Sequence, residues 1–210
     1  MRMNKYKTEQ EEFWATKFGD DYIDRNQGDT LLASNLNFFT KAFSRAGKIK
    51  SCIEFGANIG MNLKTLKLLY PKITLQGIEI NNEACEELEK IIGHKNVFKG
   101  SIFDVTLNEP ADLTLIKGVL IHINPEMLDL VYQKLYDMSK KYILIAEYYN
   151  PTPVAIKYRG HEDKLFKRDF AGEFLDKFLD TELIDYGFSY KNDPSFPQDD
   201  ITWFLIRKNS

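Results

Sequence analysis

The stretch SCIEFGANIGMNLKTL, residues 51–66, decides how this chain folds. Residues 49–55 form an apolar run with the length of a short buried strand. Two glycines, Gly56 and Gly60, follow this run, and Leu63 and Leu66 then recur at helical spacing. Glycine tolerates positive φ and carries no Cβ, so a ligand can approach the backbone of such a loop closely. The start of a helix adds unpaired N–H groups and a partial positive charge. The stretch therefore predicts a strand, a ligand-binding glycine loop and a helix.

The rest of the chain repeats this alternation of strands and helices. Two strand-like segments near the C-terminus have no helix between them and predict an antiparallel pair. We therefore expect an α/β fold with a doubly wound, mostly parallel seven-stranded sheet, an antiparallel edge strand and N-terminal helices. The expected strands are residues 49–55, 74–80, 96–99, 112–116, 142–147, 183–190 and 201–208, and the expected helices are residues 9–18, 30–46, 62–69, 83–92 and 126–139.

A chain of 210 residues is long enough for one domain with a sizeable core. We expect an N-terminal helical cap at residues 1–46 and a cofactor-binding core at residues 48–147. An acceptor-side insertion at residues 148–180 and the strand pair at residues 183–208 complete the predicted domain. In an open α/β sheet, ligands bind outside the carboxyl ends of the strands, so the loops after the first five strands are the candidate site.

The composition is that of an ordinary globular protein, and its formal net charge of −3 favours neither nucleic acid nor an anionic membrane. Cys52 and Cys85 fall in a predicted strand and a predicted helix, so we expect buried thiols and a reducing compartment. No signal-peptide core or apolar segment of membrane length is visible, which predicts a cytoplasmic protein. The three histidines, His94, His122 and His161, are too far apart in the sequence to predict a metal site.

Two acidic residues flank the glycine loop in the predicted fold. Glu79 ends the second predicted strand, 19 residues beyond Gly60, where a carboxylate can accept hydrogen bonds from both hydroxyls of a ribose. Glu54 stands shortly before the glycines, where it would repel a pyrophosphate and attract an ammonium group. A ribose and an ammonium group without a phosphate describe S-adenosylmethionine, which we therefore expect as the cofactor.

The motifs EFGANIG, GIEIN, GSIFD and LIKGVLIHI, between residues 48 and 147, resemble successive cofactor motifs of the class I S-adenosylmethionine-dependent methyltransferases. More narrowly, the chain resembles the pseudaminic acid biosynthesis-associated methylase family almost from end to end. This narrower resemblance rests on EEFWATKFGDDYIDRN, KGVLIHINPE, EYYNPTPVAIKYRGHEDKLFKRDFAGEF and PQDDITWFLIRK. The resemblance implies a Rossmann-like methyltransferase fold, and the name of the narrower family implies a sugar substrate.

The resemblance also implies which residues hold the cofactor. Glu79 falls at the ribose, and Ser101 and Ile102 fall beside the adenine. Ser101 stands where many members have an aspartate, so this contact would use the backbone or Asp104. Asn58 replaces a common glycine, which the loop can accept because asparagine tolerates left-handed backbone geometry. The implied set is Tyr22 and Arg25 from an N-terminal lid, then Glu54, Gly56, Ala57, Asn58, Gly60, Glu79, Ile80, Ser101, Ile102, Lys117 and Gly118.

Further candidate residues follow the fourth and fifth predicted strands. His122 lies one loop from the expected methyl group, where it would be either a general base or a packed core residue. Residues 148–169 are rich in tyrosines and basic groups and predict an anion-binding acceptor pocket, the alternative being a solvated charged loop. The candidate catalytic residues are His122, Tyr148, His161 and Asp169. The candidate substrate-binding residues are Tyr148, Tyr149, Asn150, Arg159, His161, Lys167 and Arg168.

We expect an enzyme that moves a methyl group to an oxygen or nitrogen of a small, polar, anionic metabolite. The resemblance implies a nonulosonic acid or a nucleotide-linked sugar as this substrate. A nucleic-acid methyltransferase is one alternative, but KGVL follows the fourth strand in place of an Asn/Asp-Pro-Pro-aromatic run. A non-catalytic subunit that binds S-adenosylmethionine is the other alternative. The sequence leaves the oligomeric state open.

Overall fold

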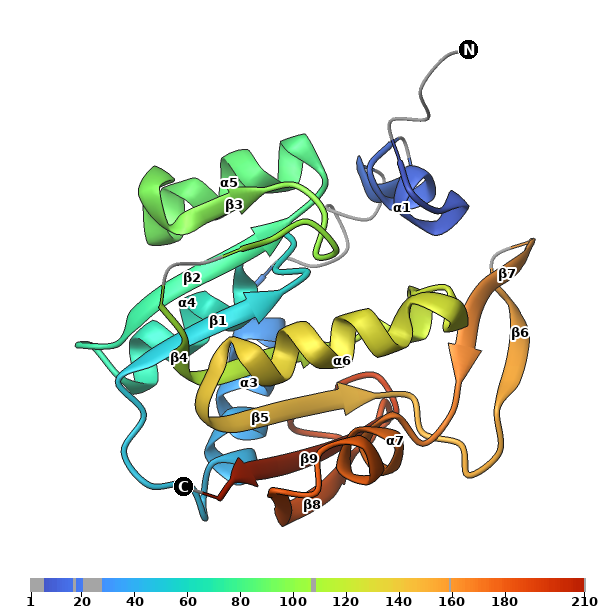
Figure 1. Cartoon of the computed structure of the whole chain (residues 1–210). Helices are drawn as coiled ribbons and strands as arrows, with labels where there is room; N and C mark the ends of the chain where they lie inside the picture. The colour runs from blue at the N-terminus through green and yellow to red at the C-terminus, as the bar shows by residue number, and fades with distance from the viewer. Residues whose placement is uncertain (1–5, 17, 21–27, 107–108, 159, 210) are drawn as a thin grey trace.

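A seven-stranded sheet forms the centre of the protein, in the order β3-β2-β1-β4-β5-β9-β8 (Figure 1). The structure is a computed structural model that describes residues 6–16, 18–20, 28–106, 109–158 and 160–209, of which residues 161–163 are described by their backbone alone. Strands β1 to β5 pair in parallel, and β9 is antiparallel to both of its neighbours. The strands are β1 (Ser51–Phe55), β2 (Thr74–Glu79), β3 (Val97–Lys99), β4 (Ala111–Lys117), β5 (Ser139–Glu147), β8 (Thr181–Ser189) and β9 (Ile201–Lys208).

The expected fold class is confirmed by this arrangement. The C-terminal antiparallel pair lies at one edge of the sheet, and within the pair β9 is the reversed strand, one position in from the edge. The order of strands reverses at β1, which lies between β2 and β4. Such a switch point leaves a crevice at the carboxyl ends of the two central strands, because their connections leave in opposite directions.

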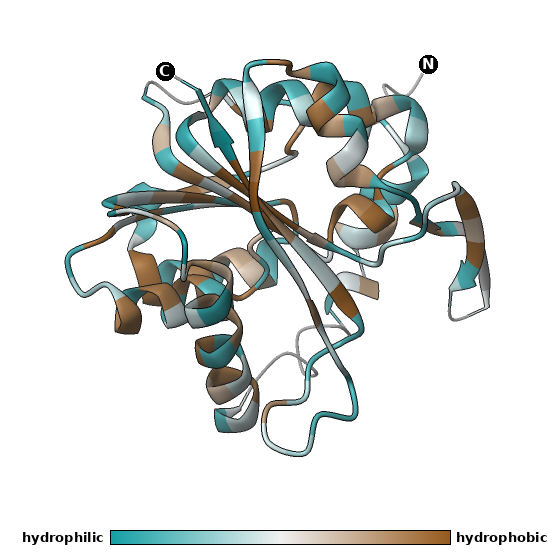
Figure 2. Ribbon diagram, turned by 90° about the horizontal axis from the view of Figure 1, so that it is seen from below, coloured by the Kyte–Doolittle hydropathy of each residue, from teal (hydrophilic) through white to brown (hydrophobic). Residues whose placement is uncertain are grey.

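Helices cover both faces of the sheet, so apolar residues concentrate along the strands between them (Figure 2). Helices α3, α4 and α5 share one core, to which they contribute Phe39, Leu66 and Leu88. Helices α6 and α7 share the other, through Leu135 and Phe174. The helices are α1 (Glu9–Trp14), α3 (Asp29–Ala42), α4 (Met61–Leu69), α5 (Asn82–Ile92), α6 (Leu128–Asp137) and α7 (Phe170–Lys177), with 3-10 turns η1 (His94–Asn96), η2 (Leu120–His122) and η3 (Pro125–Met127).

Several elements are shorter than their sequence patterns suggest. The predicted helix 30–46 ends at Ala42, after which residues 43–45 form a turn. The predicted helix 126–139 starts as the 3-10 turn η3, because the Asn124 side chain caps Glu126. The apolar face of each segment is longer than its helix because turn residues also pack against the core.

A separate hairpin was not predicted from the sequence. Strands β6 (Val154–Tyr158) and β7 (His161–Lys167) pair antiparallel outside the main sheet. Val154 and Ile156 stay exposed, so β6 lacks the buried face that gives a strand its usual alternating pattern, whereas Leu165 of β7 packs into the core. It projects beyond the carboxyl ends of β4 and β5, on the same side of the molecule as α1 (Figure 1).

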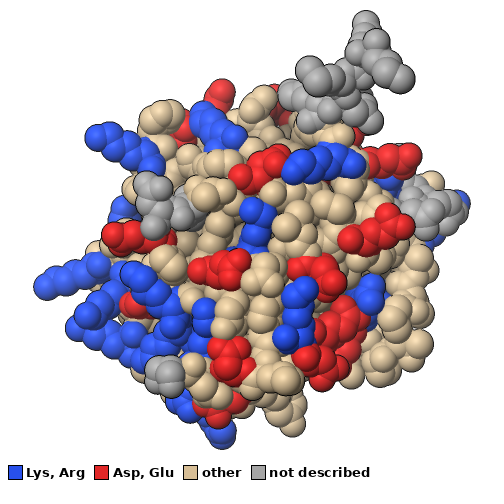
Figure 3. Space-filling model, viewed as in Figure 1, with Lys and Arg blue, Asp and Glu red and all other residues tan. Residues whose placement is uncertain are grey.

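The surface is of mixed charge, with lysines gathered at one end of the sheet (Figure 3). Exposed lysines stand at the starts of parallel strands, at the end opposite the crevice, and these are Lys48, Lys50, Lys72, Lys140 and Lys141. Both cysteines are buried free thiols, as predicted. Among the residues that the structure describes, no helix is long and apolar enough to cross a membrane.

We predict that Gly187→Ala destabilises the sheet edge. A Cβ built on Gly187 would lie 2.5 Å from Cζ2 of the buried Trp203, its partner on β9, so that ring would have to move. Overpacking of this kind costs about 1–3 kcal/mol, to be measured by urea denaturation. A variant as stable as the wild type would contradict the contact, because alanine is otherwise favoured over glycine in a strand by roughly 0.5–1 kcal/mol.

Candidate functional site

A cavity of about 550 Å³ occupies the crevice at the carboxyl ends of the central strands. Its volume lies within the range of small-molecule and cofactor sites, roughly 300–1,000 Å³. The loops after β1, β2, β3 and β4 form its floor, and the N-terminal segment, α3 and the β8–β9 connection complete its walls. Among the described residues, no three His, Cys, Asp or Glu side chains lie close enough together to hold a metal ion.

The glycine loop after β1 has the backbone geometry that the sequence predicts. Gly56 has φ +71°, and a Cβ on it would lie 2.6 Å from Val119 Cγ2. Gly60 has φ +83° and precedes the first residue of α4. Asn58 adopts the left-handed region, with φ +47°, which asparagine accepts at low cost. The loop therefore keeps its backbone open to the cavity and packs closely against the loop after β4.

Glu79 binds three backbone N–H groups of the cavity floor. Its Oε2 accepts a hydrogen bond from Asn58 N at 2.7 Å, and its Oε1 accepts from Ile80 N and Asn81 N, both at 2.8 Å. Burial raises the pKa of Glu79, and the three N–H donors oppose that rise. The carboxylate thus joins the loop after β1 to the loop after β2. Because Oε2 accepts one hydrogen bond from the residues that the structure describes, it keeps capacity for a ligand hydroxyl.

Glu54 lies beneath the glycine loop and does not line the cavity. It is 1% exposed, and its Oε1 accepts a hydrogen bond from Asn62 Nδ2 at 2.6 Å. Burial raises the pKa of Glu54 to about 8, although Asn62 and Lys117 act in the opposite direction. Burial also lowers the pKa of Lys117, which does line the cavity. Glu54 below the loop and Lys117 at the cavity wall are therefore both desolvated, and each favours the charged form of the other.

His122 lines the cavity as a neutral base with a defined tautomer. Its Nδ1 lies 2.7 Å from the Lys164 carbonyl oxygen on β7. Since a carbonyl only accepts, Nδ1 carries the proton and Nε2 carries the lone pair. Burial lowers the pKa of His122 to about 4, against the effect of this hydrogen bond. The rings of Trp14 and Tyr158 lie 4.6 and 5.1 Å from the imidazole, centroid to centroid, and fix its orientation.

A buried carboxylate also fixes the loop that carries His122. Glu147, at the end of β5, is 2% exposed and accepts hydrogen bonds from Val119 N at 3.0 Å and Leu120 N at 2.9 Å. Burial raises the pKa of Glu147 to about 7, and the backbone donors oppose the rise. The end of β5 therefore holds the η2 turn in the way that the end of β2 holds the glycine loop.

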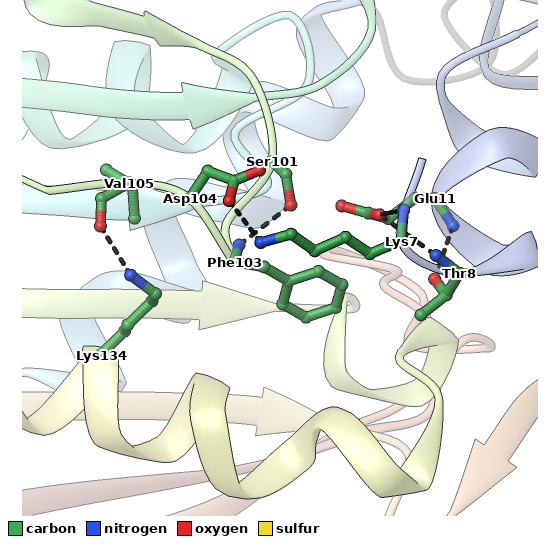
Figure 4. A network of polar contacts seen from close by, with 8 residues as sticks. All are labelled: Lys7, Thr8, Glu11, Ser101, Phe103, Asp104, Val105 and Lys134. Carbon is green, nitrogen blue, oxygen red and sulfur yellow. Dashed lines mark hydrogen bonds and ion pairs between the residues drawn. The ribbon is translucent and has the colours of Figure 1, made fainter. Parts of the chain in front are cut away.

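The N-terminal segment closes the cavity from above and is tied to three separate elements. Lys7 forms an ion pair with Asp104 in the loop after β3 (Figure 4). Asn81, which caps α5, donates from Nδ2 to Asp20 Oδ1 at 2.6 Å. Glu9 of α1 pairs with Lys164 Nζ of the hairpin at 3.1 Å. Figure 4 also shows Ser101, whose Oγ accepts from Phe103 N at 3.0 Å and so is used within its own loop.

The structure brings together most of the residues predicted to hold the cofactor. Ten predicted residues line the cavity: Gly56, Ala57, Asn58, Glu79, Ile80, Ser101, Ile102, Lys117, Gly118 and His122. Glu54 and Gly60 support the loop from outside the lining. Three predicted residues, Tyr22, Arg25 and Arg159, lie outside the described residues, and His161 is described by its backbone alone.

The other predicted acceptor residues lie outside the cavity lining and have structural contacts there. Lys167 Nζ lies 5.2 Å from the centroid of the Tyr148 ring. Arg168 Nε donates to Glu173 Oε1 at 2.6 Å. Asp169 Oδ1 caps α7 by accepting from Gly172 N at 2.8 Å. Two further residues are near the surface, Tyr149 against Phe204 and Asn150 bonded to the Thr152 carbonyl.

Four residues of the site were not selected from the sequence: Asn35, Asn81, Glu147 and Gln198. Asn81 directly precedes a helix in the motif GIEIN, so its role as the helix cap could have been predicted from the sequence. Glu147 ends a central strand, as Glu79 does, so a similar place at the site could have been predicted for it. The remaining two meet across 163 positions of the sequence, from α3 and the β8–β9 connection, and no local pattern indicates that contact.

No protein-family model and no curated protein matches the chain. Solved structures, in contrast, are similar to the chain. A 1,6-didemethyltoxoflavin-N1-methyltransferase of Burkholderia thailandensis, with S-adenosylhomocysteine bound, has a TM-score of 0.72 at 12% identity, covering 99% of this chain and 94% of that one. The magnesium protoporphyrin IX methyltransferase of Synechocystis PCC 6803, with S-adenosylmethionine bound, has a TM-score of 0.65 at 10% identity, covering 99% and 100%.

A mitomycin 7-O-methyltransferase has a TM-score of 0.68 at 13% identity, covering 96% of this chain, which spans 61% of that protein's length. Structural similarity at such low sequence identity shows that the fold is shared, and nothing beyond the fold. The chain therefore has the Rossmann-like fold of class I S-adenosylmethionine-dependent methyltransferases.

We predict that His122 makes the stability of the folded protein fall in mild acid. A histidine whose pKa is lowered from its usual 6.5 to about 4 contributes stability above pH 6.5 that is lost as the pH falls toward 4. Between pH 7 and pH 5 this loss amounts to about 2 kcal/mol. His122→Phe keeps an aromatic ring beside Trp14 but cannot be protonated. Its unfolding free energy, measured with denaturant at both pH values, should fall by about 2 kcal/mol less than that of the wild type. Equal losses would contradict the buried neutral imidazole.

Proposed function

We propose that this protein is a methyltransferase that binds S-adenosylmethionine along the ends of β1 to β4 and its methyl acceptor beside His122. One observation carries the proposal. A single cavity joins the glycine loop, the Glu79 carboxylate, the Ser101 loop and an imidazole whose Nε2 holds a lone pair. The loops of an open α/β sheet are where such a ligand binds, and the fold is one that structures of known methyltransferases share.

The residues of the cavity fit the expected cofactor. The contact between Gly56 and Val119 leaves room for backbone and ligand but none for a side chain at position 56. Glu79 Oε2 has capacity for a ribose hydroxyl, and the loop containing Ser101 and Ile102 provides a wall for the adenine. When bound, S-adenosylmethionine supplies a methyl group made electrophilic by its sulfonium. The chain itself must supply alignment, exclusion of water and a place for the acceptor proton.

His122 is the group that we assign to the acceptor proton. Its Nδ1 is occupied by the Lys164 carbonyl, so Nε2 is the nitrogen that can accept a proton as the new bond forms. Glu147 holds the turn that carries the ring, and Trp14 with Tyr158 holds the ring plane. The N-terminal segment covers the same place and excludes water from it. The other catalytic candidates, Tyr148, His161 and Asp169, are second to His122 because none of them lines the cavity.

The acceptor that we propose is a small polar metabolite, methylated on oxygen or nitrogen. A nonulosonic acid or nucleotide-linked sugar is the finer proposal, supported by the sequence motifs on which the narrower family resemblance rests. The described lining offers two cations for an anionic group, Lys117 and Lys191. The predicted basic residues Lys167 and Arg168 lie outside this lining.

The two alternative functions fit the structure less well. The exposed lysine cluster lies at the opposite end of the strands from the cavity, so it offers no basic track by which a nucleic acid would reach His122 (Figure 3). A non-catalytic binding subunit would not need a buried imidazole held in one tautomer at the cavity wall. Both observations favour catalysis on a small molecule.

The cofactor assignment predicts that the wild type binds S-adenosylhomocysteine in calorimetry and that Glu79→Gln weakens this binding. Loss of the charged acceptor should cost about 1.5–3 kcal/mol in binding free energy. The substitution will also lower stability, because Asn58 N loses its acceptor. Glu83→Gln, on the exposed start of α5, is the matched control and should bind as the wild type does. Wild-type affinity in Glu79→Gln would exclude the ribose contact.

The catalytic assignment predicts a product heavier by one CH2 group after incubation with S-adenosylmethionine and a pool of nucleotide sugars and nonulosonic acids. His122→Phe should reduce the rate of product formation about 100- to 10,000-fold, because it removes the proton acceptor. Its affinity for S-adenosylhomocysteine should stay near that of the wild type. Undiminished turnover in His122→Phe would show that the acceptor proton leaves by another route.

A further inference from the structure

The strand at one edge of the sheet, β8, lacks most of the features that keep an edge strand from pairing with another chain. Among the described residues it pairs with β9 alone, and it forms the lower edge of the sheet in Figure 1. It is nine residues long and contains no lysine, arginine or proline, which are the residues that commonly block such an edge. A bulge interrupts its register between Leu183 and Asp185, whereas residues 185–189 pair one to one with β9. The second half of β8 is therefore a regular edge that no side chain of this kind protects.

Three aromatic side chains stand exposed along this half of the edge. Tyr186, Phe188 and Tyr190 are 66%, 61% and 49% exposed, and alternate residues of a strand lie on one face. The ring centroids of Phe188 and Tyr190 lie 6.3 Å apart, and Tyr186 stacks on Phe204 of β9 at 6.4 Å. Phe204 in turn packs against the core that α6 and α7 share. This aromatic row, Tyr186, Phe188 and Tyr190, therefore extends an apolar surface past the last strand, which is typical of a protein–protein contact.

The residues around Phe188 follow a pattern that is symmetric about it. In the segment DYGFSYK, Phe188 is flanked on each side by a small residue, then a tyrosine, then a charged residue, which is Asp185 on one side and Lys191 on the other. When two copies of a strand pair antiparallel about a two-fold axis at Phe188, residues at equal distances from the axis lie opposite each other. Phe188 then faces Phe188 of the second copy, and Tyr186 faces Tyr190. Each Asp185 faces a Lys191, so the two copies match in both aromatic character and charge.

Other registers of self-pairing match less well. A pair centred on Asp185 places two carboxylates opposite each other, which destabilises a sheet. A pair centred on Gly187 places Asp185 opposite Ser189 and Lys191 opposite Leu183, so the opposite charges no longer meet. Cross-strand pairs of aromatic residues and of opposite charges both stabilise a sheet, and the register centred on Phe188 provides both kinds.

The two charged residues have only weak partners within their own chain. Arg45 Nε lies 3.6 Å from Asp185 Oδ2, and Lys191 Nζ lies 3.7 Å from Asp200 Oδ2. The basic side chain of each pair is more than half exposed, and exposed ion pairs of this length contribute little to stability. Each charge can therefore pair across a contact with a second chain. This charge complementarity identifies another copy of the same chain as the partner that the edge fits.

We propose that β8 pairs antiparallel with β8 of a second copy of this chain, about a two-fold axis at Phe188, to form a homodimer with one continuous sheet. The aromatic row of each copy packs against that of the other. A contact in which both copies use the same surface closes on itself, so it gives a dimer and not a fibre. The inference is independent of the proposed function, because the residues of the aromatic row do not line the cavity.

The mass of the full chain in solution tests the contact. Sedimentation equilibrium of the wild type should give twice the mass of one chain. Phe188→Lys places two like charges on the axis and should raise the dissociation constant of the dimer about 10- to 100-fold. Leu68→Lys makes the same kind of change at an exposed apolar residue of α4 and should leave the dimer unchanged. A monomeric wild type, or a Phe188→Lys variant that dimerises as the wild type does, would overturn the proposal.

Single cysteine substitutions test the register and do not depend on the folding of Phe188→Lys. Only a residue on the axis faces itself, so Phe188→Cys should form a disulfide between two chains in oxidised glutathione. Tyr186→Cys is the control, because its two copies would lie roughly 13 Å apart, beyond the reach of a disulfide. Cys52 and Cys85 are buried and should not react. Non-reducing electrophoresis that shows no linked chains in Phe188→Cys, or equal linking in Tyr186→Cys, would exclude this pairing.

Discussion

The Glu79 carboxylate, bonded to the backbone N–H groups of Asn58, Ile80 and Asn81, is the interaction on which the site depends. These bonds join the loop after β1 to the loop after β2 at the point where the strand order reverses. Without them, three backbone N–H groups of the cavity floor would lose their acceptor and the glycine loop would lose its anchor. The raised pKa of Glu79 reflects the cost of burying this carboxylate, which the three donors partly offset. A residue expected to serve the ligand therefore also builds the cavity floor.

Glu147 repeats this device on the other side of the switch point. Its carboxylate holds Val119 N and Leu120 N, and so sets the turn from which His122 enters the cavity. Both glutamates are the last residues of parallel strands, where a side chain can reach the N–H groups of the neighbouring loop. The end of each of these strands therefore positions the loop that follows the neighbouring strand. The glycine loop and the imidazole are consequently held by the same sheet, which is the arrangement that aligned transfer between two ligands requires.

The roof of the cavity depends on contacts between segments far apart in the sequence. The N-terminal segment reaches the loop after β3 through Lys7, α5 through Asp20, and the hairpin through Glu9. The hairpin in turn supplies the Lys164 carbonyl that selects the tautomer of His122. Ion pairs between exposed groups are weak individually, so we expect the roof to be less stable than the sheet and to open for ligands. Ligand exchange and proton acceptance by His122 would then both depend on the N-terminal segment and the β6–β7 hairpin.

The sequence by itself determined the sheet, the glycine loop and Glu79, because periodicity, strand length and glycine position are local properties of the chain. Strand β9 has the predicted bounds, and β1, α4 and β2 differ from prediction by one or two residues. Only the tertiary structure decided which polar residues face the cavity. Arg168 and Asp169 look like ligand-binding residues in the sequence, yet an ion pair with Glu173 and the cap of α7 occupy them. Asn35 and Gln198 look ordinary, yet they meet at the cavity wall. A residue type fixes what a side chain can bind, whereas its partner is fixed by packing between segments that the local pattern does not relate.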